Sequence, residues 1–343
     1  MLKTKWITSV VLLSLSLIGI SWAAPTGDVK PEEFYKSSIM NFTCPAAAGG
    51  NVDGLSRIWV NFLKGELGAR AIVLANRRGG GGLEGYMYLW NAKPDGRALG
   101  VGLREVITMN NILEEPGATY KSEDYSFIFT IGNEPIVCTV TPGITLDRLK
   151  AGKGWKFASG TFGSSGSLSA TVIDALGLDA KVVLGFPSSS TSRLSVQQGE
   201  SVGMTYSLAT ALEGMKMKQV EALCIVGGKR HPALPGVPAL TELATTLTEE
   251  QRFRIEKLWG TWQTKSWMLL GPPGIPKDRL DYLRKKAESI SKRSDFRRMV
   301  NSAMDYEGTD YRTGAEIEKE VKDLMKENAR IRRTLDELHK YVM

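Results

Sequence analysis

Apolar positions along this chain occur in two patterns, short continuous runs and longer stretches with helical spacing. The first continuous run covers 39–44 and stops at Pro45. Apolar side chains then recur every three or four residues from Leu55 to Leu67, and Gly68 follows. Short apolar runs bounded by Pro or Gly are typical of buried strands, and the wider spacing is typical of helices. The pattern predicts a strand, a loop of small residues and a helix.

The same alternation continues to the end of the chain. Helical spacing follows most of the apolar runs, and a last long helix is predicted from Thr313 to Leu338, with Glu316 completing a capping box. Short strands that alternate with helices are typical of an α/β fold with parallel sheets. Further strands are predicted at 71–75, 98–102, 127–131, 136–140, 156–159, 182–184, 202–206, 221–226 and 267–270.

Two of the predicted strand-to-helix loops have the composition of anion-binding loops. Small side chains let a ligand approach the backbone amides, and the first turn of a helix favours negative charge. Asp53 is expected to be the N-cap that fixes the first turn. The alternative is that the glycines serve only tight packing. The candidate ligand residues are Ala47, Ala48, Gly49, Gly50 and Asp53 in the first loop, and Ser159, Gly160, Gly163, Ser164 and Ser165 in the second.

Other motifs give weaker indications of a functional site. The glycines at 79–82 do not have the G-x-G-x-x-G spacing of a dinucleotide loop. Arg104 is expected to be a solvated rim charge, with a contact to a ligand carboxylate as the alternative. The two histidines, His231 and His339, lack partners at metal-ligand spacing. The serines at 164–165 lack the G-x-S-x-G spacing of a hydrolase elbow, so a catalytic serine is a minor alternative.

Composition and charge change this picture little. The chain has 343 residues, enough for two lobes, and a formal net charge of +7. A mild positive charge favours anionic small ligands and gives no indication of nucleic-acid binding. The three cysteines, Cys44, Cys138 and Cys224, lie in separate apolar runs without the spacing of a disulfide framework or zinc site. They are expected to be buried thiols.

Residues 1–23 have the pattern of a secretory signal peptide. Lys3 and Lys5 precede an apolar stretch from 7 to 20, and small residues end at Ala23. The alternative is an N-terminal membrane anchor, but the apolar stretch is shorter than the ~20 residues that a membrane-spanning helix needs. Export to the periplasm, with cleavage near Ala23, is therefore expected.

Six motifs in order resemble those of one family, the Bug-type (TctC-like) extracytoplasmic solute-binding proteins of tripartite tricarboxylate transporters. They cover nearly the whole chain after the signal peptide. They lie at 42–53, 75–82, 93–96, 157–164, 229–238 and 271–276.

This resemblance implies a two-lobed periplasmic binding protein of type II (Venus flytrap), in which each lobe has a mainly parallel sheet flanked by helices. Lobe 1 would comprise 34–136 plus 258–343, and lobe 2 would comprise 137–257. Both candidate loops would hold one ligand carboxylate. Ser188, Thr205 and Tyr206 would face the variable end of the ligand, where the chain departs from the family pattern at 186–190 and 204–207.

The implied function is capture of an organic carboxylate (di-, tri- or aromatic) in the periplasm and its delivery to a membrane permease. An acidic residue that the family often has near 204–207 is absent, which argues against an amino-acid ligand. The expected protein is a monomer and no enzyme, without a cofactor, metal or nucleic-acid partner. The alternative is a periplasmic ligand-reporting protein that docks on a sensor.

Overall fold

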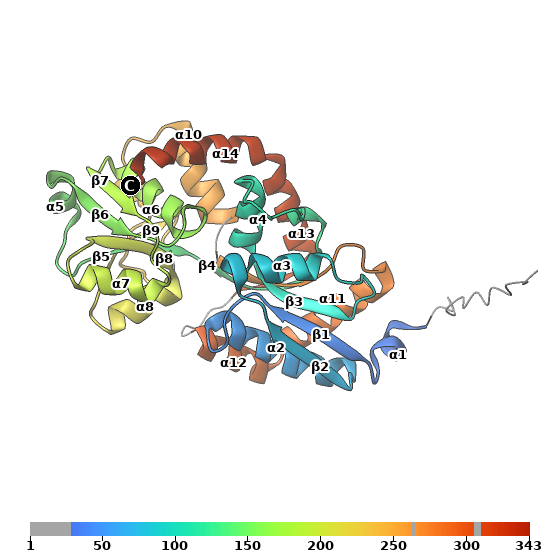
Figure 1. Cartoon of the computed structure of the whole chain (residues 1–343). Coiled ribbons are helices and arrows are strands. Elements are labelled where there is room, and N and C mark those ends of the chain that lie inside the picture. The colour runs from blue at the N-terminus through green and yellow to red at the C-terminus, as the bar shows by residue number, and fades with distance from the viewer. Residues whose placement is uncertain (1–28, 263–264, 305–309) are drawn as a thin grey trace, which may run out of the picture.

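The chain folds into two lobes, each built on its own β-sheet (Figure 1). The computed structural model describes residues 29–262, 265–304 and 310–343, so the predicted signal peptide at 1–23 lies outside the described residues. No helix in the described part of the chain combines the length and the apolar character needed to cross a membrane.

The sheet of lobe 1 contains nearly all the strands predicted at both ends of the chain. The first three strands form its parallel half. Two long strands that lead to and from lobe 2, and a short edge strand at 311–313, form its antiparallel half. The order across the sheet is β11 (Tyr311–Thr313), β4 (Ser126–Glu134), β10 (Lys265–Gly271), β3 (Ala98–Leu103), β1 (Ile39–Cys44) and β2 (Ala71–Asn76).

The sheet of lobe 2 is made from the middle of the chain. Its parallel strands β7, β6 and β8 lie on one side, and β5 runs antiparallel between β8 and β9. The order is β7 (Ala180–Val183), β6 (Trp155–Ala158), β8 (Gly203–Ser207), β5 (Ile136–Val140) and β9 (Glu221–Val226).

The α/β two-lobed fold class is confirmed, but both sheets are mixed where mainly parallel sheets were predicted. The difference arises at the crossings between the lobes. β4 carries the chain out of lobe 1 and β10 brings it back, so these neighbouring strands run in opposite directions. β5, which enters lobe 2 directly after Pro135, runs against both of its neighbours for the same reason.

Helices cover both faces of each sheet. Several follow the strands directly. In chain order, the α-helices are α1 (Pro31–Tyr35), α2 (Asn51–Leu67), α3 (Leu83–Trp90), α4 (Arg104–Ile112), α5 (Leu146–Ala151), α6 (Ser167–Leu176), α7 (Ser189–Gln197), α8 (Leu208–Lys216), α9 (Leu240–Leu243), α10 (Glu249–Arg252), α11 (Lys277–Ser291), α12 (Ser294–Met304), α13 (Gly314–Lys326) and α14 (Asn328–Asp336). Shorter or wider helical segments are η1 (Gly79–Gly82), η2 (Ser122–Asp124), η3 (Phe162–Gly166), η4 (Phe253–Trp262) and η5 (Glu337–Tyr341).

The core of lobe 1 shows why the helical spacing at 55–67 gives a helix on this sheet. Trp59 of α2 is fully buried against Phe129 of β4 and Phe296 of α12, with ring centroids 5.8 and 4.9 Å apart. Leu55 and Leu63 lie in the same cluster. Each such side chain contributes about 1.5–3 kcal/mol through removal from water. This packing fixes the start of α2, and with it the first candidate loop.

The C-terminal end departs from the predicted lobe division. The long helix predicted from Thr313 is divided at Glu327 into α13 and α14. α13 packs on the lobe 1 sheet, whereas Ile331, Leu335 and Leu338 belong to the core of lobe 2. Residue 342 even pairs with Val182 of β7. Residues 328–343 therefore contact lobe 2, and α14 also contacts α4 of lobe 1, although 258–343 was expected to belong to lobe 1 alone.

Candidate functional site

The first candidate loop leaves the carboxyl end of β1 and enters α2. Ala47, Ala48, Gly49 and Gly50 are all exposed. Gly49 has a φ of +88°, a conformation that favours glycine. Gly50 is the N-cap of α2, so the prediction that Asp53 is the N-cap was wrong. The helical spacing of apolar residues begins at Leu55, but the helix itself begins four residues earlier, at Asn51.

Asp53 instead holds the loop in shape from inside the first helical turn. Its carboxylate accepts hydrogen bonds from the Gly49 amide, the Asn76 side chain and Arg57 Nε, each at 2.9 Å. Burial acts to raise the pKa of Asp53, but these bonds outweigh it and lower the pKa to about 2. Because the Gly49 amide already donates to Asp53, this amide is engaged within the loop.

The second candidate loop is a wide helical turn, η3, between β6 and α6. Its serines are bonded within the loop: Ser165 Oγ accepts from the Gly160 amide at 2.9 Å, and Ser164 Oγ lies 3.0 Å from Thr161 Oγ1. Ser159 is fully buried, and its hydroxyl lies 3.2 Å from Ser169 Oγ. Ser164 is exposed, whereas Ser159 and Ser165 shape the loop from within.

The two loops are connected in the structure through α4. β1 and β3 are parallel neighbours, so the first loop and the start of α4 lie at the same edge of the lobe 1 sheet. α4 then reaches the second loop, because a Cβ atom at Gly163 would lie 3.1 Å from Leu113 Cδ1, just beyond α4. This contact links the lobe 1 edge that carries Gly49 to the loop of lobe 2.

The three residues expected near the variable end of a ligand lie in different settings. Ser188 is exposed and is the N-cap of α7, where its hydroxyl accepts from the Thr191 amide at 3.2 Å. The Tyr206 hydroxyl lies 2.9 Å from Ser192 Oγ. Thr205 is fully buried, and its Oγ1 has no hydrogen-bond partner within the described residues. Of these three residues, Thr205 is thus the one whose hydroxyl has no hydrogen-bond partner among the described residues.

Ser167, at the start of α6, is a second buried hydroxyl without a partner among the described residues. The sequence analysis did not select it, although it continues the small polar run of the second loop. A buried hydroxyl left unpaired costs about 1–3 kcal/mol, a cost that a ligand or a bound water can offset. Ser167 and Thr205 are therefore two buried hydroxyls of lobe 2 with unused hydrogen-bonding capacity among the described residues.

Arg104 is neither a solvated charge nor exposed to a ligand. It is 1% exposed and forms an ion pair with Glu320 of α13 at 2.8 Å. Burial and the nearby Arg312 lower its pKa to about 10. The sequence alone did not reveal this pairing, since α13 lies more than two hundred positions further along the chain.

The structure brings one histidine close to the second loop. The ring of His339 stacks on Phe162, with centroids 3.9 Å apart. The hydroxyls of Ser164 and Ser165 form hydrogen bonds within their own loop, to Thr161 and Gly160 respectively. Within the described residues, no group of three or more His, Cys, Asp or Glu side chains has metal-binding geometry.

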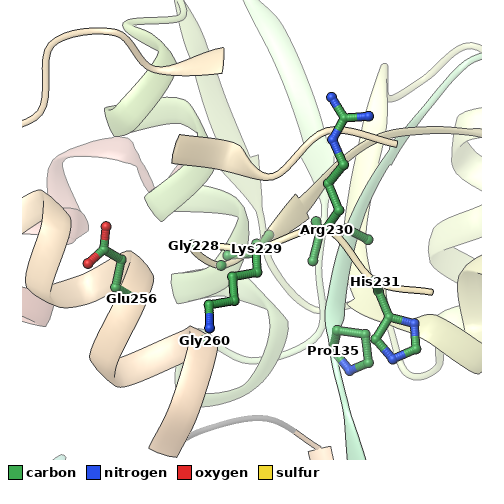
Figure 2. A pocket seen from close by; sticks show the side chains of 10 residues that line it. Pro135, Gly228, Lys229, Arg230, His231, Glu256 and Gly260 are labelled. Carbon is green, nitrogen blue, oxygen red and sulfur yellow. The ribbon is translucent and has the colours of Figure 1, made fainter. Parts of the chain in front are cut away.

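A cavity of about 530 Å³ lies beside the crossings between the lobes (Figure 2). It lies between the end of β9 and η4, with Pro135 of the first crossing in its wall. Its polar lining includes Lys229, His231 and Glu256, and burial lowers the pKa of His231. Most of its wall is formed by residues 225–231, at the end of β9 and in the loop that follows.

Known proteins are similar to this chain over most of its length. No family model matches it. BugT of Bordetella pertussis is 25% identical over 240 residues, which cover 67% of this chain and 73% of that protein. A UPF0065 protein from the tcbD-tcbE intergenic region of Pseudomonas sp. is also 25% identical over 240 residues, covering 66% and 70%.

Solved structures share the fold along most of the chain. A TctC solute-binding protein from Polaromonas has a TM-score of 0.65 at 19% identity, covering 88% of this chain and 99% of that one. MatC from Rhodopseudomonas palustris with bound malate has a TM-score of 0.64 at 19% identity, covering 87% and 99%. An adipate-bound R. palustris protein has a TM-score of 0.67 at 17% identity, covering 88% and 98%. Together with the ordered motifs, these matches confirm that the chain resembles solute-binding proteins of the Bug/TctC type.

Proposed function

We propose that this protein captures an organic carboxylate in the periplasm, between its two lobes, and delivers it to a tripartite tricarboxylate-type membrane permease. The observation that carries the proposal is the pair of strand–loop–helix units, one in each lobe, at 45–53 and 159–167. They lie at strand carboxyl ends, and α4 connects one sheet edge to the other loop through the contact of Leu113 with Gly163.

The ligand class follows from the chemistry of these loops. Backbone amides and helix N-termini favour a carboxylate, each helix end contributing up to ~2 kcal/mol. Charge-assisted hydrogen bonds contribute ~1.5–3 kcal/mol each. A few such bonds give micromolar affinity, about −8 kcal/mol, after ordering costs. The malate and adipate bound by the two similar R. palustris proteins belong to the same chemical class.

A calorimetric screen of the mature protein tests the proposal. Dicarboxylates, tricarboxylates and aromatic carboxylates are titrated at neutral pH, and mass spectrometry identifies whatever co-purifies. At least one carboxylate is expected to bind in the micromolar range, with weaker binding of its amide or ester. A panel in which no carboxylate binds would contradict the proposal.

A charge placed in the first loop provides a site-specific test. Ala48 is exposed in that loop, so Ala48→Asp introduces a negative charge with little effect on packing. The affinity for a carboxylate is expected to fall tenfold or more, which corresponds to about 1.4 kcal/mol. The matched control is Ala151→Asp, also exposed but at the end of α5. An equal affinity of the two variants would place the ligand elsewhere.

Delivery to a permease is tested separately. The purified protein, loaded with the ligand from the screen, is added to membranes or vesicles that contain a tripartite tricarboxylate-type permease. Uptake of labelled ligand that depends on the added protein is expected. Binding without such uptake, together with capture of a sensor protein, would favour the ligand-reporting alternative.

A further inference from the structure

Two of the three cysteines, distant in sequence, face each other in the structure. Cys138 in β5 and Cys224 in β9 are directly opposite partners in the antiparallel pair of these strands. Both side chains are completely buried in the same apolar cluster of lobe 2, so they lie on the same face of the sheet.

The position of the two residues matches the geometry of a disulfide bond. Directly opposed residues in antiparallel strands have Cα atoms about 4.5–5.5 Å apart. Disulfide-bonded cysteines have Cα atoms about 4.4–6.8 Å apart. A hydrogen bond between the two thiols, together with burial, raises the pKa of Cys224. Both thiols are free in this structure, and because the two residues lie opposite each other, little backbone movement is needed to join them.

We propose that Cys138 and Cys224 form a cross-strand disulfide when the protein folds in an oxidising environment. An exported protein meets such an environment, since disulfides persist in the periplasm and outside the cell. The bond would close a loop between β5 and β9, and such a loop stabilises a fold mainly by restricting the unfolded chain. Export is part of the proposed function, but the geometry of the pair does not depend on the ligand.

The reaction is thiol–disulfide exchange with an external disulfide, either an oxidised protein thiol oxidoreductase or glutathione disulfide. The thiolate of one cysteine attacks the external disulfide, forming a mixed disulfide and releasing one thiolate. The second cysteine, as a thiolate, attacks the sulfur of the first cysteine in the mixed disulfide. This forms the bond within the protein and releases the remaining half of the external disulfide as a thiolate. Two protein protons are lost, and the oxidant is reduced to two thiols. Because both sulfurs are buried in the final sheet, this exchange precedes the completion of folding.

Cys44 serves as an internal control. It is buried in lobe 1 at the end of β1, where its sulfur lies 3.8 Å from the Ala46 carbonyl oxygen. It belongs to the other sheet. The proposal therefore predicts one bond and one remaining thiol in each chain.

The test is oxidative refolding of the full chain. The reduced, denatured protein is refolded in a mixture of reduced and oxidised glutathione, then denatured in the presence of an alkylating agent without reductant. Mass spectrometry is expected to find Cys44 alkylated and a peptide pair joined through Cys138 and Cys224. Three alkylated cysteines in protein that has refolded, or a bond to Cys44, would overturn the proposal.

Thermal unfolding gives a second measurement. Reduction before refolding is expected to lower the midpoint of the unaltered chain by roughly 5 °C or more. Cys138→Ala and Cys224→Ala are each expected to abolish this dependence of the midpoint on redox state. The double variant is expected to respond to reduction as little as either single variant. Cys44→Ala is expected to retain it. A midpoint that does not respond to reduction, or that responds only through Cys44, would overturn the proposal.

Discussion

At the scale of single residues, the loops depend on buried polar groups that the residue pattern only partly reveals. The glycines and serines of both loops could be selected from the sequence because they interrupt apolar runs. Whether a given hydroxyl is free to bind depends on hydrogen bonds that the residue pattern does not show. Ser165 is used to hold the Gly160 amide, whereas Thr205 has no partner among the described residues. Fewer hydroxyls are therefore without a partner than the candidate residues chosen from the sequence.

Thr205 gives a direct test of this distinction. Thr205→Val keeps the shape of the side chain and removes its hydroxyl. If the hydroxyl bonds the ligand, affinity is expected to fall about fivefold to tenfold, near 1 kcal/mol, while stability is unchanged or slightly raised. Calorimetry and urea unfolding measure the two effects.

The matched control for Thr205 is Thr130→Val in β4. Thr130 is equally buried, and its hydroxyl also lacks a partner among the described residues, but it belongs to the sheet of lobe 1. Unchanged affinity is expected for this control. If both variants bind as the unaltered protein does, Thr205 does not contact the ligand.

Asp53 links the first loop to acid stability. Its pKa in the folded protein lies below the ordinary value of 3.8, at about 2. The stabilisation is therefore fully present above pH 3.8 and is lost as the pH falls toward 2. Asp53→Asn is expected to lower the free energy of unfolding by about 1–3 kcal/mol at neutral pH.

Urea unfolding at several pH values tests this contribution. The difference in stability between Asp53→Asn and the unaltered protein is expected to be constant near neutrality and to shrink below pH 3.8. A difference that stays the same down to pH 2.5 would show that the ionised carboxylate is not what holds the loop.

At the scale of elements, the sequence predicts strands better than their directions. The continuous apolar runs locate β1 to β10 to within a few residues, because each strand is buried on at least one face. β11 is missed because it is a short edge strand whose residues are only half-buried. Strand direction depends on which strands cross between lobes, and no local pattern records it. The break at Glu327 is hidden for a similar reason, since Leu324 and Ile331 continue one helical stripe across it.

The packing of η4 against β9 offers a test at this scale. Gly227 follows β9 and Gly260 lies in η4, and the two backbones approach closely: a Cβ atom at Gly260 would lie 2.9 Å from the Ile255 carbonyl oxygen and 3.4 Å from the Gly227 Cα. Gly260→Ala is expected to lower the free energy of unfolding by about 1–3 kcal/mol, because backbone atoms must move. Gly236→Ala, whose added Cβ would meet no atom within 4 Å, is the control. Equal stability of both variants in urea would contradict this account.

At the scale of the whole molecule, the C-terminal segment ties the lobes together. α13 packs on the sheet of lobe 1, and α14 and η5 pack on lobe 2, as the red end of the chain shows in Figure 1. A hinged binding protein closes by rotation about the segments that join its lobes. Here the C-terminal segment joins the two lobes in addition to the strand crossings.

That attachment centres on Asp174 of α6. Its carboxylate accepts hydrogen bonds from Arg254 at 3.1 Å, Gln251 at 3.0 Å and the Tyr341 hydroxyl at 2.7 Å. Arg254, only 2% exposed, also donates to the Thr334 carbonyl oxygen of α14 at 2.9 Å. Asp174→Asn would leave the buried guanidinium without its counter-charge. Breaking a buried ion pair in this way typically costs about 3–5 kcal/mol.

Hydrogen exchange separates a local effect from a global one. In Asp174→Asn, amides at 328–341 are expected to exchange faster under native conditions, while those of β1 and β3 in lobe 1 remain protected, because the lost contacts lie between α6, η4 and the C-terminal segment. Asp147→Asn, an exposed carboxylate in α5, is the control and is expected to change neither exchange nor stability. Protection at 328–341 equal to that of the unaltered protein would show that apolar packing alone, through Ile331, Leu335 and Leu338, holds the C-terminal segment on lobe 2.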